Sequence, residues 1–153
     1  MNLIKKGRRI LVENGYTFVA LKKDEIYSST LHGIKPLMSK IFVSNAYFKD
    51  YVVIDRVIGR AAALLLIRSK VKYIHGFILS EPAKDLLEQY HIDYSYDYLV
   101  PYITNRDKNR MCSLEASVLD VDDLEQGFKI ICREMIDNAV IKLGPGKKFK
   151  FNY

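Results

Sequence analysis

The sequence has few residues that could form disulfides, bind zinc or cross a membrane. Two cysteines, Cys112 and Cys132, and three histidines occur in 153 residues. One cysteine pair in a chain of this length makes no disulfide framework, and no Cys/His spacing is typical of a zinc site. The longest wholly apolar run, residues 61–67, is far shorter than the roughly 20 residues that span a bilayer. Since residues 1–15 lack a signal-peptide pattern, we expect a cytoplasmic protein with no membrane partner and no cofactor.

The net charge of +6 is concentrated towards the two ends of the chain. Four lysines lie within residues 142–153, and removing these four charges leaves +2 for the rest. A second basic cluster lies within residues 5–9. Charge near the termini more often gives solubility or a flexible arm than a nucleic-acid groove. Nucleic acid is therefore disfavoured as a partner.

Two apolar segments predict the centre of the fold. Residues 51–55 and 72–80 show little polar alternation, as expected of strands covered on both faces. Each is followed by a helical pattern, over residues 56–70 and 81–91. Alternating buried strands and helices require parallel pairing through right-handed crossovers, while a hairpin over residues 16–30 adds an antiparallel edge. The predicted fold class is α/β, a three-layer α/β/α sandwich around a mixed sheet of about five strands.

The remaining elements are predicted from apolar spacing and from helix start and stop signals. They are a helix over 2–14 that ends at Gly15, a short helix over 33–42, a strand over 92–103 or two short strands around Pro101, a helical turn over 112–118 and a last helix over 122–140. Asp122 and Glu125 are predicted to form a capping box at the start of the last helix. We expect one domain over residues 1–141, followed by a flexible basic tail, 142–153.

Five blocks of sequence occur in an order that is similar to a known family. They are "GIKPLM", "VVIDRVIGRAAALLL", "SEPAKDLL", "LVPYITNRD" and "MCSLEASVLDVDD". Together they resemble an uncharacterised prokaryotic family, a domain of unknown function whose fold resembles that of cytidine deaminase. The resemblance covers roughly residues 15–137, and its strength lies in the whole series of blocks in order. It implies the same α/β/α architecture that the apolar pattern predicts.

The resemblance also implies that the deaminase metal is missing. Zinc deaminases bind the metal through a His/Cys–x–Glu motif on one helix and a Pro–Cys–x–x–Cys motif on the next. The corresponding segments of this chain, "GIKPLMSK" and "IDRVIGRAA", contain neither motif. We therefore expect a deaminase-like fold without catalytic zinc, and no zinc-dependent deamination.

The junction at Asp55, Arg56 and Gly59 is the first candidate site. Ligands of open α/β sheets bind beyond the carboxyl ends of parallel strands, where Asp55 is predicted to lie. Asp55 could equally cap the following helix. Gly59 costs a helix about 1 kcal/mol relative to alanine, which suggests close approach of a ligand or of packed backbone. Capping with packing and a ligand site are both open on the residues alone. The resemblance favours a site, because a zinc-ligand motif occupies this position in the deaminases.

Ser80 and Glu81 form a second strand-to-helix junction. If the two strands are parallel neighbours, free backbone N–H groups at this junction would face the same crevice and favour an anion. The alternative is an ordinary helix start, with Ser80 or Glu81 as the cap.

The loop before residue 112 and the turn after it hold the other candidates. Asn105 and Arg106 lie in a polar loop, and arginine can hold a phosphate or carboxylate through two hydrogen bonds. A solvated turn is the alternative. Cys112 precedes a helical turn, which could stabilise a thiolate, and Glu115 follows three residues later. A small buried thiol is the competing interpretation of Cys112, whereas Cys132 is expected in the core.

Three alternating tyrosines, Tyr94, Tyr96 and Tyr98, are predicted to share one face of a strand. Aromatic side chains on a sheet can stack on bases or pack against a helix or a dimer partner. The acidic neighbours Asp93 and Asp97 would repel phosphates, so packing is favoured. A homo-oligomer, in the simplest case a dimer, is expected.

These features support one main hypothesis and one alternative. The main hypothesis is a pocket for a small anionic, nucleotide-like metabolite at the Asp55 junction, with Arg56 or Arg106 supplying charge and Gly59 giving room. If a reaction follows, Asp55 is the candidate base or covalent acceptor, and Cys112 is the second catalytic candidate. The alternative is a non-catalytic regulatory or protein-interaction module on an enzyme fold.

Overall fold

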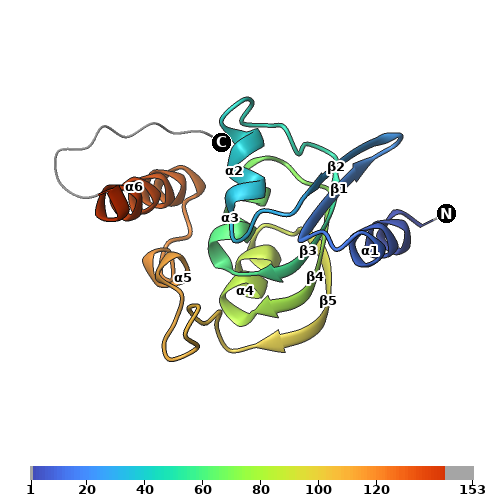
Figure 1. Cartoon of the computed structure of the whole chain (residues 1–153). Coiled ribbons are helices and arrows are strands. Elements are labelled where there is room, and N and C mark those ends of the chain that lie inside the picture. The colour runs from blue at the N-terminus through green and yellow to red at the C-terminus, as the bar shows by residue number, and fades with distance from the viewer. Residues whose placement is uncertain (1, 144–153) are drawn as a thin grey trace.

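A computed structural model of the chain describes residues 2–143. The helices and strands follow one another in this order along the chain: α1 (Leu3–Glu13), β1 (Phe18–Lys22), β2 (Glu25–Ser29), α2 (Lys35–Ile41), β3 (Val52–Ile58), α3 (Arg60–Arg68), β4 (Tyr73–Ser80), α4 (Glu81–Gln89), β5 (Asp93–Val100), α5 (Ser113–Ser117) and α6 (Leu124–Leu143). Figure 1 shows a curved sheet with α1 on one side and the other helices on the opposite side. The predicted tail lies largely outside the described residues.

The sheet has five strands in the order β2-β1-β3-β4-β5. β1 pairs with β2 and β3 in antiparallel fashion, and β3–β4 and β4–β5 are parallel. This arrangement confirms the predicted mixed sheet. It also brings the carboxyl ends of β3, β4 and β5 to the same side, the side at which α/β proteins place ligands.

Two apolar layers cover the two faces of the sheet. Under α1, Leu11 packs with β1 and β3 residues, including Leu21 and Ile54. A Cβ added at Gly7 would lie 2.6 Å from Leu21 Cδ1 and from Ile54 Cγ1, so a glycine lets α1 approach the sheet closely. On the other face, α2, α3 and α4 bury the main core, and α5 and α6 pack outside α3. The fold is therefore a three-layer α/β/α sandwich, as predicted.

Two predicted helix starts differ from the structure. β3 continues to Ile58, three residues beyond Asp55, because Val57 and Ile58 pair with Ile78 and Leu79 of β4 instead of beginning α3. At α6, Asp123 Oδ1 accepts a hydrogen bond from Gln126 N at 2.7 Å. The predicted capping box of Asp122 and Glu125 is wrong, since both carboxylates bind arginines, Arg60 and Arg68, of α3 instead.

Buried Arg60 ties the start of α3 to the segments around it. Its Nε donates to Val118 O at 2.8 Å, Nη1 donates to Pro82 O at 2.9 Å, and Nη2 donates to Val121 O at 2.8 Å. Nη2 also pairs with Asp122 Oδ1 at 2.7 Å. One guanidinium thus fixes α4, the end of α5 and the α5–α6 link relative to α3.

Among the described residues, no helix is both long enough and apolar enough to cross a membrane.

Candidate functional site

A cleft of about 1330 Å³ lies at the carboxyl ends of the strands. Its walls come from the segment 32–35 that leads into α2, from Val57 and Ile78 near the ends of β3 and β4, and from residues 100–106 and Lys108 at the end of β5 and in the loop after it. Cys112 and Leu114 of the α5 region, with Met135 and Asn138 of α6, complete the walls. The cleft therefore lies where the parallel strands end, in the position that this class of sheet predicts.

The lining of the cleft combines an apolar floor with a basic rim. Apolar side chains come from the strand ends and from α6, and Lys35, Arg106, Lys108 and His32 stand at the rim. Among the described residues that line the cleft, none is an aspartate or a glutamate. Such a lining favours a molecule that has an apolar or aromatic part and an anionic part.

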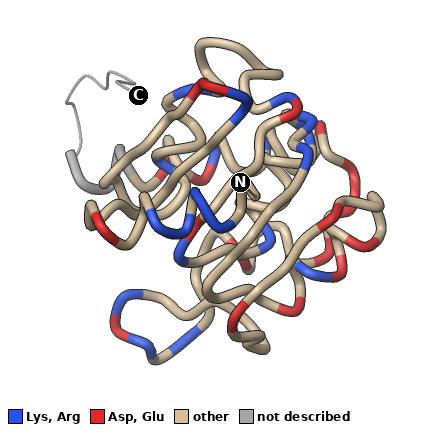
Figure 2. Tube along the Cα trace, turned by 90° about the vertical axis from the view of Figure 1, so that its right-hand side faces the viewer, with Lys and Arg blue, Asp and Glu red and all other residues tan. Residues whose placement is uncertain are grey.

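The loop between β5 and α5 provides much of the basic rim. It projects from the body at the bottom of Figure 1 and at the lower left of Figure 2, where most of its coloured positions are basic. Asn105 Nδ2 donates to Asn109 Oδ1 at 2.9 Å and Asn105 Oδ1 accepts from Asn109 N at 3.2 Å, so the predicted ligand residue Asn105 shapes the loop. Within the described part of the chain, exposed Arg106 has no ion pair or hydrogen bond and is free for a ligand.

Buried Glu115 lies behind the cleft wall, where the starts of α3 and α4 meet. Its Oε1 accepts from Arg60 N and from Ser80 Oγ, both at 2.6 Å, and its Oε2 accepts from Ile103 N. A Cβ at Gly59 would lie 3.1 Å from this Oε1 and 2.9 Å from Ile103 Cγ1, so Gly59 makes room for the carboxylate and not for the cleft. Helix N-termini favour an anion, and here the Glu115 carboxylate of the same chain is that anion.

The second predicted junction is thus part of this internal network. Ser80 Oγ accepts from Ala83 N at 3.2 Å and caps α4, as the helix-start interpretation predicts. The same hydroxyl donates a hydrogen bond to Glu115 Oε1. Glu81 is an exposed residue in the first turn of α4 and does not line the cleft.

Asp55 and Arg56 do not line the cleft, although the next residue, Val57, does. Asp55 is in the middle of β3, opposite Phe18 on one side and Gly76 on the other, so its predicted role as cap of α3 is wrong. Burial raises the pKa of its carboxyl to about 7, although hydrogen bonds from the Val57 and Arg56 backbone act in the opposite direction. Arg56 lies among the residues under α1, where its Nε donates to Tyr16 O at 2.8 Å.

The residues around the start of α3 do not fit a zinc ion. A deaminase-type site would need thiolate or imidazole ligands at this position. The groups present are Gly59, Arg60, Ser80 and Glu115, and each oxygen of the carboxylate already accepts from N–H or O–H donors. Within the described residues, no group of three His, Cys, Asp or Glu side chains is arranged to hold a metal.

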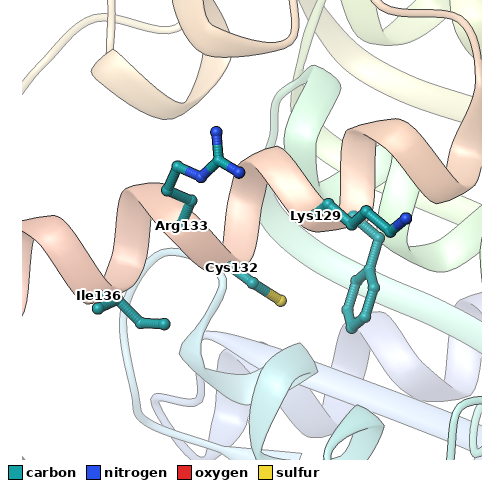
Figure 3. A pocket seen from close by; sticks show the side chains of 5 residues that line it. Lys129, Cys132, Arg133 and Ile136 are labelled. Carbon is teal, nitrogen blue, oxygen red and sulfur yellow. The ribbon is translucent and has the colours of Figure 1, made fainter.

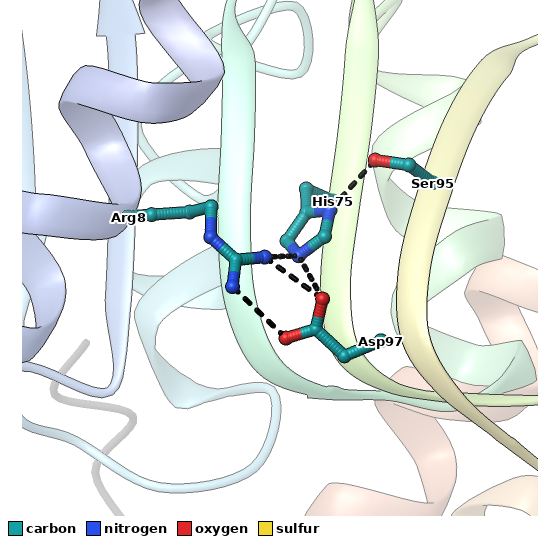
Figure 4. Close-up of polar contacts among 4 residues, drawn as sticks. All are labelled: Arg8, His75, Ser95 and Asp97. Atoms are coloured by element: carbon teal, nitrogen blue, oxygen red, sulfur yellow. Dashed lines mark hydrogen bonds and ion pairs between the residues drawn. The ribbon is translucent and has the colours of Figure 1, made fainter.

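A polar cluster that the sequence did not predict links α1 to the sheet. Arg8 of α1 donates from Nη1 and Nη2 to the two oxygens of Asp97 at 2.9 and 3.1 Å, and Nη1 lies 2.5 Å from His75 Nε2 (Figure 4). His75 Nδ1 is 2.6 Å from Ser95 Oγ. The alternation of Ser95 and Asp97 along β5 is the signal that could have placed both on one face.

This Ser–His–Asp combination is not a nucleophilic triad. Arg8 has only donors, so His75 Nε2 must accept from it, and Nδ1 carries the ring proton towards Ser95. A general base would need a free lone pair facing the serine hydroxyl. The cluster is therefore a structural clasp between α1, β4 and β5.

The clasp predicts acid sensitivity at His75. Burial and the nearby Arg8 charge lower the pKa of His75, against a smaller raising effect of Asp97. The stability that neutral His75 contributes is therefore fully present above its unfolded pKa of 6.5 and is lost as the pH falls below that value. In urea unfolding, the stability of His75→Asn should rise relative to that of the wild type as the pH falls from 8 to 5. A difference between the two proteins that does not change with pH would show that His75 causes no acid sensitivity.

A second, smaller hollow lies along α6. It has a volume of about 370 Å³ and is lined by Phe128, Lys129, Cys132, Arg133 and Ile136 (Figure 3). Burial raises the pKa of the Cys132 thiol, with a weaker opposite effect of Arg68. Cys132 is half-buried instead of fully in the core, and its raised pKa makes it a poor nucleophile.

Comparisons with known proteins identify the family. The family model for a domain of unknown function, DUF1893, matches residues 6–135. A DUF1893 family protein from Thermotoga maritima has a crystal structure that is similar to this chain, with a TM-score of 0.79 and 30% sequence identity over 87% of this chain and 90% of that one. No curated protein matches the sequence. The match confirms the resemblance to a family of unknown function, while the likeness to cytidine deaminase stays a prediction. The chain belongs to the DUF1893 family.

Proposed function

We propose that the cleft binds a small anionic, nucleotide-like molecule. The observation that carries this proposal is the lining: Lys35, Arg106 and Lys108 stand around an apolar floor, and no described residue of the lining is acidic. The position at the carboxyl ends of parallel strands adds independent support. The centre of the site thus moves from Asp55, where the sequence predicted it, to the loop that carries Arg106.

Two kinds of lining residue would bind the two parts of such a molecule: basic residues the anionic part, and aromatic or apolar residues the base. The Arg106 guanidinium can hold a phosphate or carboxylate through two hydrogen bonds, and Lys108 adds a second positive charge. Tyr102, which is 41% exposed, offers a ring on which a base can stack. Apolar lining residues such as Ile78 and Met135 would reduce the contact of such a ring with water. Of the two catalytic candidates, Cys112 lines the cleft and Asp55 does not, so Cys112 is the better placed for any reaction.

Native mass spectrometry of protein purified from cells identifies a retained ligand, and calorimetry with nucleoside mono- and diphosphates measures affinity. We expect the Arg106→Ala/Lys108→Ala double variant to bind at least about tenfold more weakly, since each lost contact to an anion is worth about 1.5–3 kcal/mol. Arg133→Ala is the matched control, because Arg133 is an exposed basic residue that lines the other hollow.

Two outcomes would reject the proposal. One is equal affinity in the double variant and the control, which would place the ligand elsewhere. The other is the absence of any bound or titrating anionic molecule, which would leave the alternative, a non-catalytic regulatory or protein-interaction module.

We also propose that the protein is cytoplasmic and acts as a homo-oligomer. Both cysteines are free thiols, which suits a reducing compartment. The exposed edge strand β5 supports self-association. Fractionation of the source cells tests the first point.

A further inference from the structure

We infer that two copies of this chain pair through their β5 strands, antiparallel and centred on Tyr96, to form one continuous sheet. β5 is the last strand of the sheet and pairs with β4 along one side only. Its eight residues leave a row of backbone donors and acceptors on the other side. The inference does not depend on the cleft, since a monomer could bind the same ligand.

The β5 edge lacks the residues that usually prevent strand-to-strand association. Lysine, proline and a short strand are the common protections, and the sequence of β5, DYSYDYLV, has neither residue type. Tyr96 and Tyr98 remain 38% and 71% exposed. The opposite edge, β2, is only five residues long, so β5 is the better template for pairing.

One inward charge that could protect the edge is already neutralised. Asp97 lies in the middle of β5, where an unpaired carboxylate would disfavour pairing with another strand. Arg8 of the same chain holds both its oxygens at 2.9 and 3.1 Å (Figure 4). Asp97 can therefore face a neighbouring strand without an unpaired negative charge.

Geometry restricts the register of such a pair. Directly opposite residues in an antiparallel pair share a face of the sheet, so a two-fold axis must pass through a residue and not between two. With the axis at Tyr96, Tyr94 faces the partner's Tyr98 and Ser95 faces the partner's Asp97. Aromatic pairs and a serine–aspartate hydrogen bond stabilise a sheet.

The neighbouring registers are less favourable. An axis at Ser95 would place Asp93 opposite the partner's Asp97, and an axis at Asp97 would place that residue opposite its own copy. Like charges directly opposite each other are destabilising. The Tyr96 register avoids both, and it pairs residues 93–99 before Pro101 ends the ladder.

Light scattering coupled to gel filtration tests the association. The wild type should have twice the 17.7 kDa mass of one chain and should dissociate on dilution. Tyr96→Lys places two lysines opposite each other at the axis and should give the single-chain mass with an unchanged circular dichroism spectrum. Ile136→Lys is the matched control, because Ile136 is 42% exposed on α6, and it should leave the dimer intact. A wild type of 17.7 kDa at every concentration overturns the inference.

Cysteine cross-linking tests the register in a Cys112→Ser, Cys132→Ser background. Opposed Cα atoms in an antiparallel pair are about 4.5–5.5 Å apart, within the range that a disulfide spans. Tyr96→Cys should therefore give a covalent dimer on mild oxidation. Tyr98→Cys should not, because its two copies would be offset by four residues, roughly 13 Å along the strand. Equal cross-linking of the two variants, or cross-linking of Tyr98→Cys alone, overturns the Tyr96-centred pairing.

Discussion

Replacing Glu115 with alanine is expected to lower the free energy of unfolding by about 3–5 kcal/mol. Glu115 belongs to a helix of only five residues, yet its side chain is 2% exposed. Its carboxylate accepts hydrogen bonds from Arg60 N, Ser80 Oγ and Ile103 N. Alanine would leave these three donors without the acceptor and open a cavity beside Gly59. Each buried donor without a partner costs about 1–3 kcal/mol.

Glu115→Gln separates the contribution of the hydrogen bonds to stability from that of the volume that the side chain fills. Glutamine has almost the same shape but only one acceptor oxygen. That oxygen can replace Oε1 and keep the bonds from Arg60 and Ser80, while the amide nitrogen would then face Ile103 N–H. We therefore expect Glu115→Gln to have a free energy of unfolding between those of the wild type and Glu115→Ala. Urea unfolding measures all three proteins.

Glu81→Gln is the matched control, because it makes the same chemical change in an exposed first-turn residue of α4. It should change stability by less than about 0.5 kcal/mol. If Glu115→Ala lowers the free energy of unfolding no more than this control does, the carboxylate does not hold the starts of α3 and α4 together. If Glu115→Ala binds the cleft ligand as before in its folded fraction, the residue is structural, as its burial behind the wall indicates.

The fold was predictable because its signals are periodic and local. The apolar runs around Val53 and Ile74 required covered strands, and Pro82 with Ser80 marked the start of α4 correctly. The end of β3 was misplaced because Asp55 is a typical cap residue at the end of an apolar run. The parallel ladder with β4 determines where β3 ends, and that pairing is a tertiary contact.

The site was less predictable because its parts come from distant segments. Arg106 was a candidate on the residue type and lines the cleft, but the residues across the cleft from it, such as Lys35 and Met135, lie far away in the sequence. The sequence does not predict a buried role for Arg60, since an arginine beside an apolar helical run is usually solvated. Its carbonyl acceptors belong to α4 and the α5–α6 region, and backbone carbonyls leave no pattern in a sequence.

Replacing Asp55 with asparagine is expected to stabilise the protein at neutral and alkaline pH. Burial raises the pKa of Asp55 from 3.8 to about 7 in the folded protein. The stability linked to the protonated form is fully present below the unfolded pKa of 3.8 and is lost as the pH rises through about 7. Asparagine is neutral throughout and can still accept from Val57 N. Above pH 7 the variant should therefore be more stable by up to about 4 kcal/mol, and near pH 4 the two proteins should be equal.

Urea unfolding from pH 4 to pH 9 measures this difference directly. A difference between the two proteins that does not change with pH would mean that the carboxyl titrates normally and is not desolvated. Ligand affinity gives a second readout, since Asp55 does not line the cleft. A large loss of affinity in Asp55→Asn would instead show that Asp55 belongs to the ligand site, as the sequence predicted.

The same experiment separates Asp55 from His75, because the two groups act with opposite sign. Acidification protonates buried Asp55, which favours the folded state, and it protonates His75 beside Arg8, which opposes it. In the wild type these effects partly cancel below pH 7, so the stability profile there should be shallow. Asp55→Asn removes one of them and should become steadily less stable on acidification, because the His75 effect is then uncompensated. Adding His75→Asn should make the profile shallow again, and a double variant that keeps the acid loss would assign that loss to other groups.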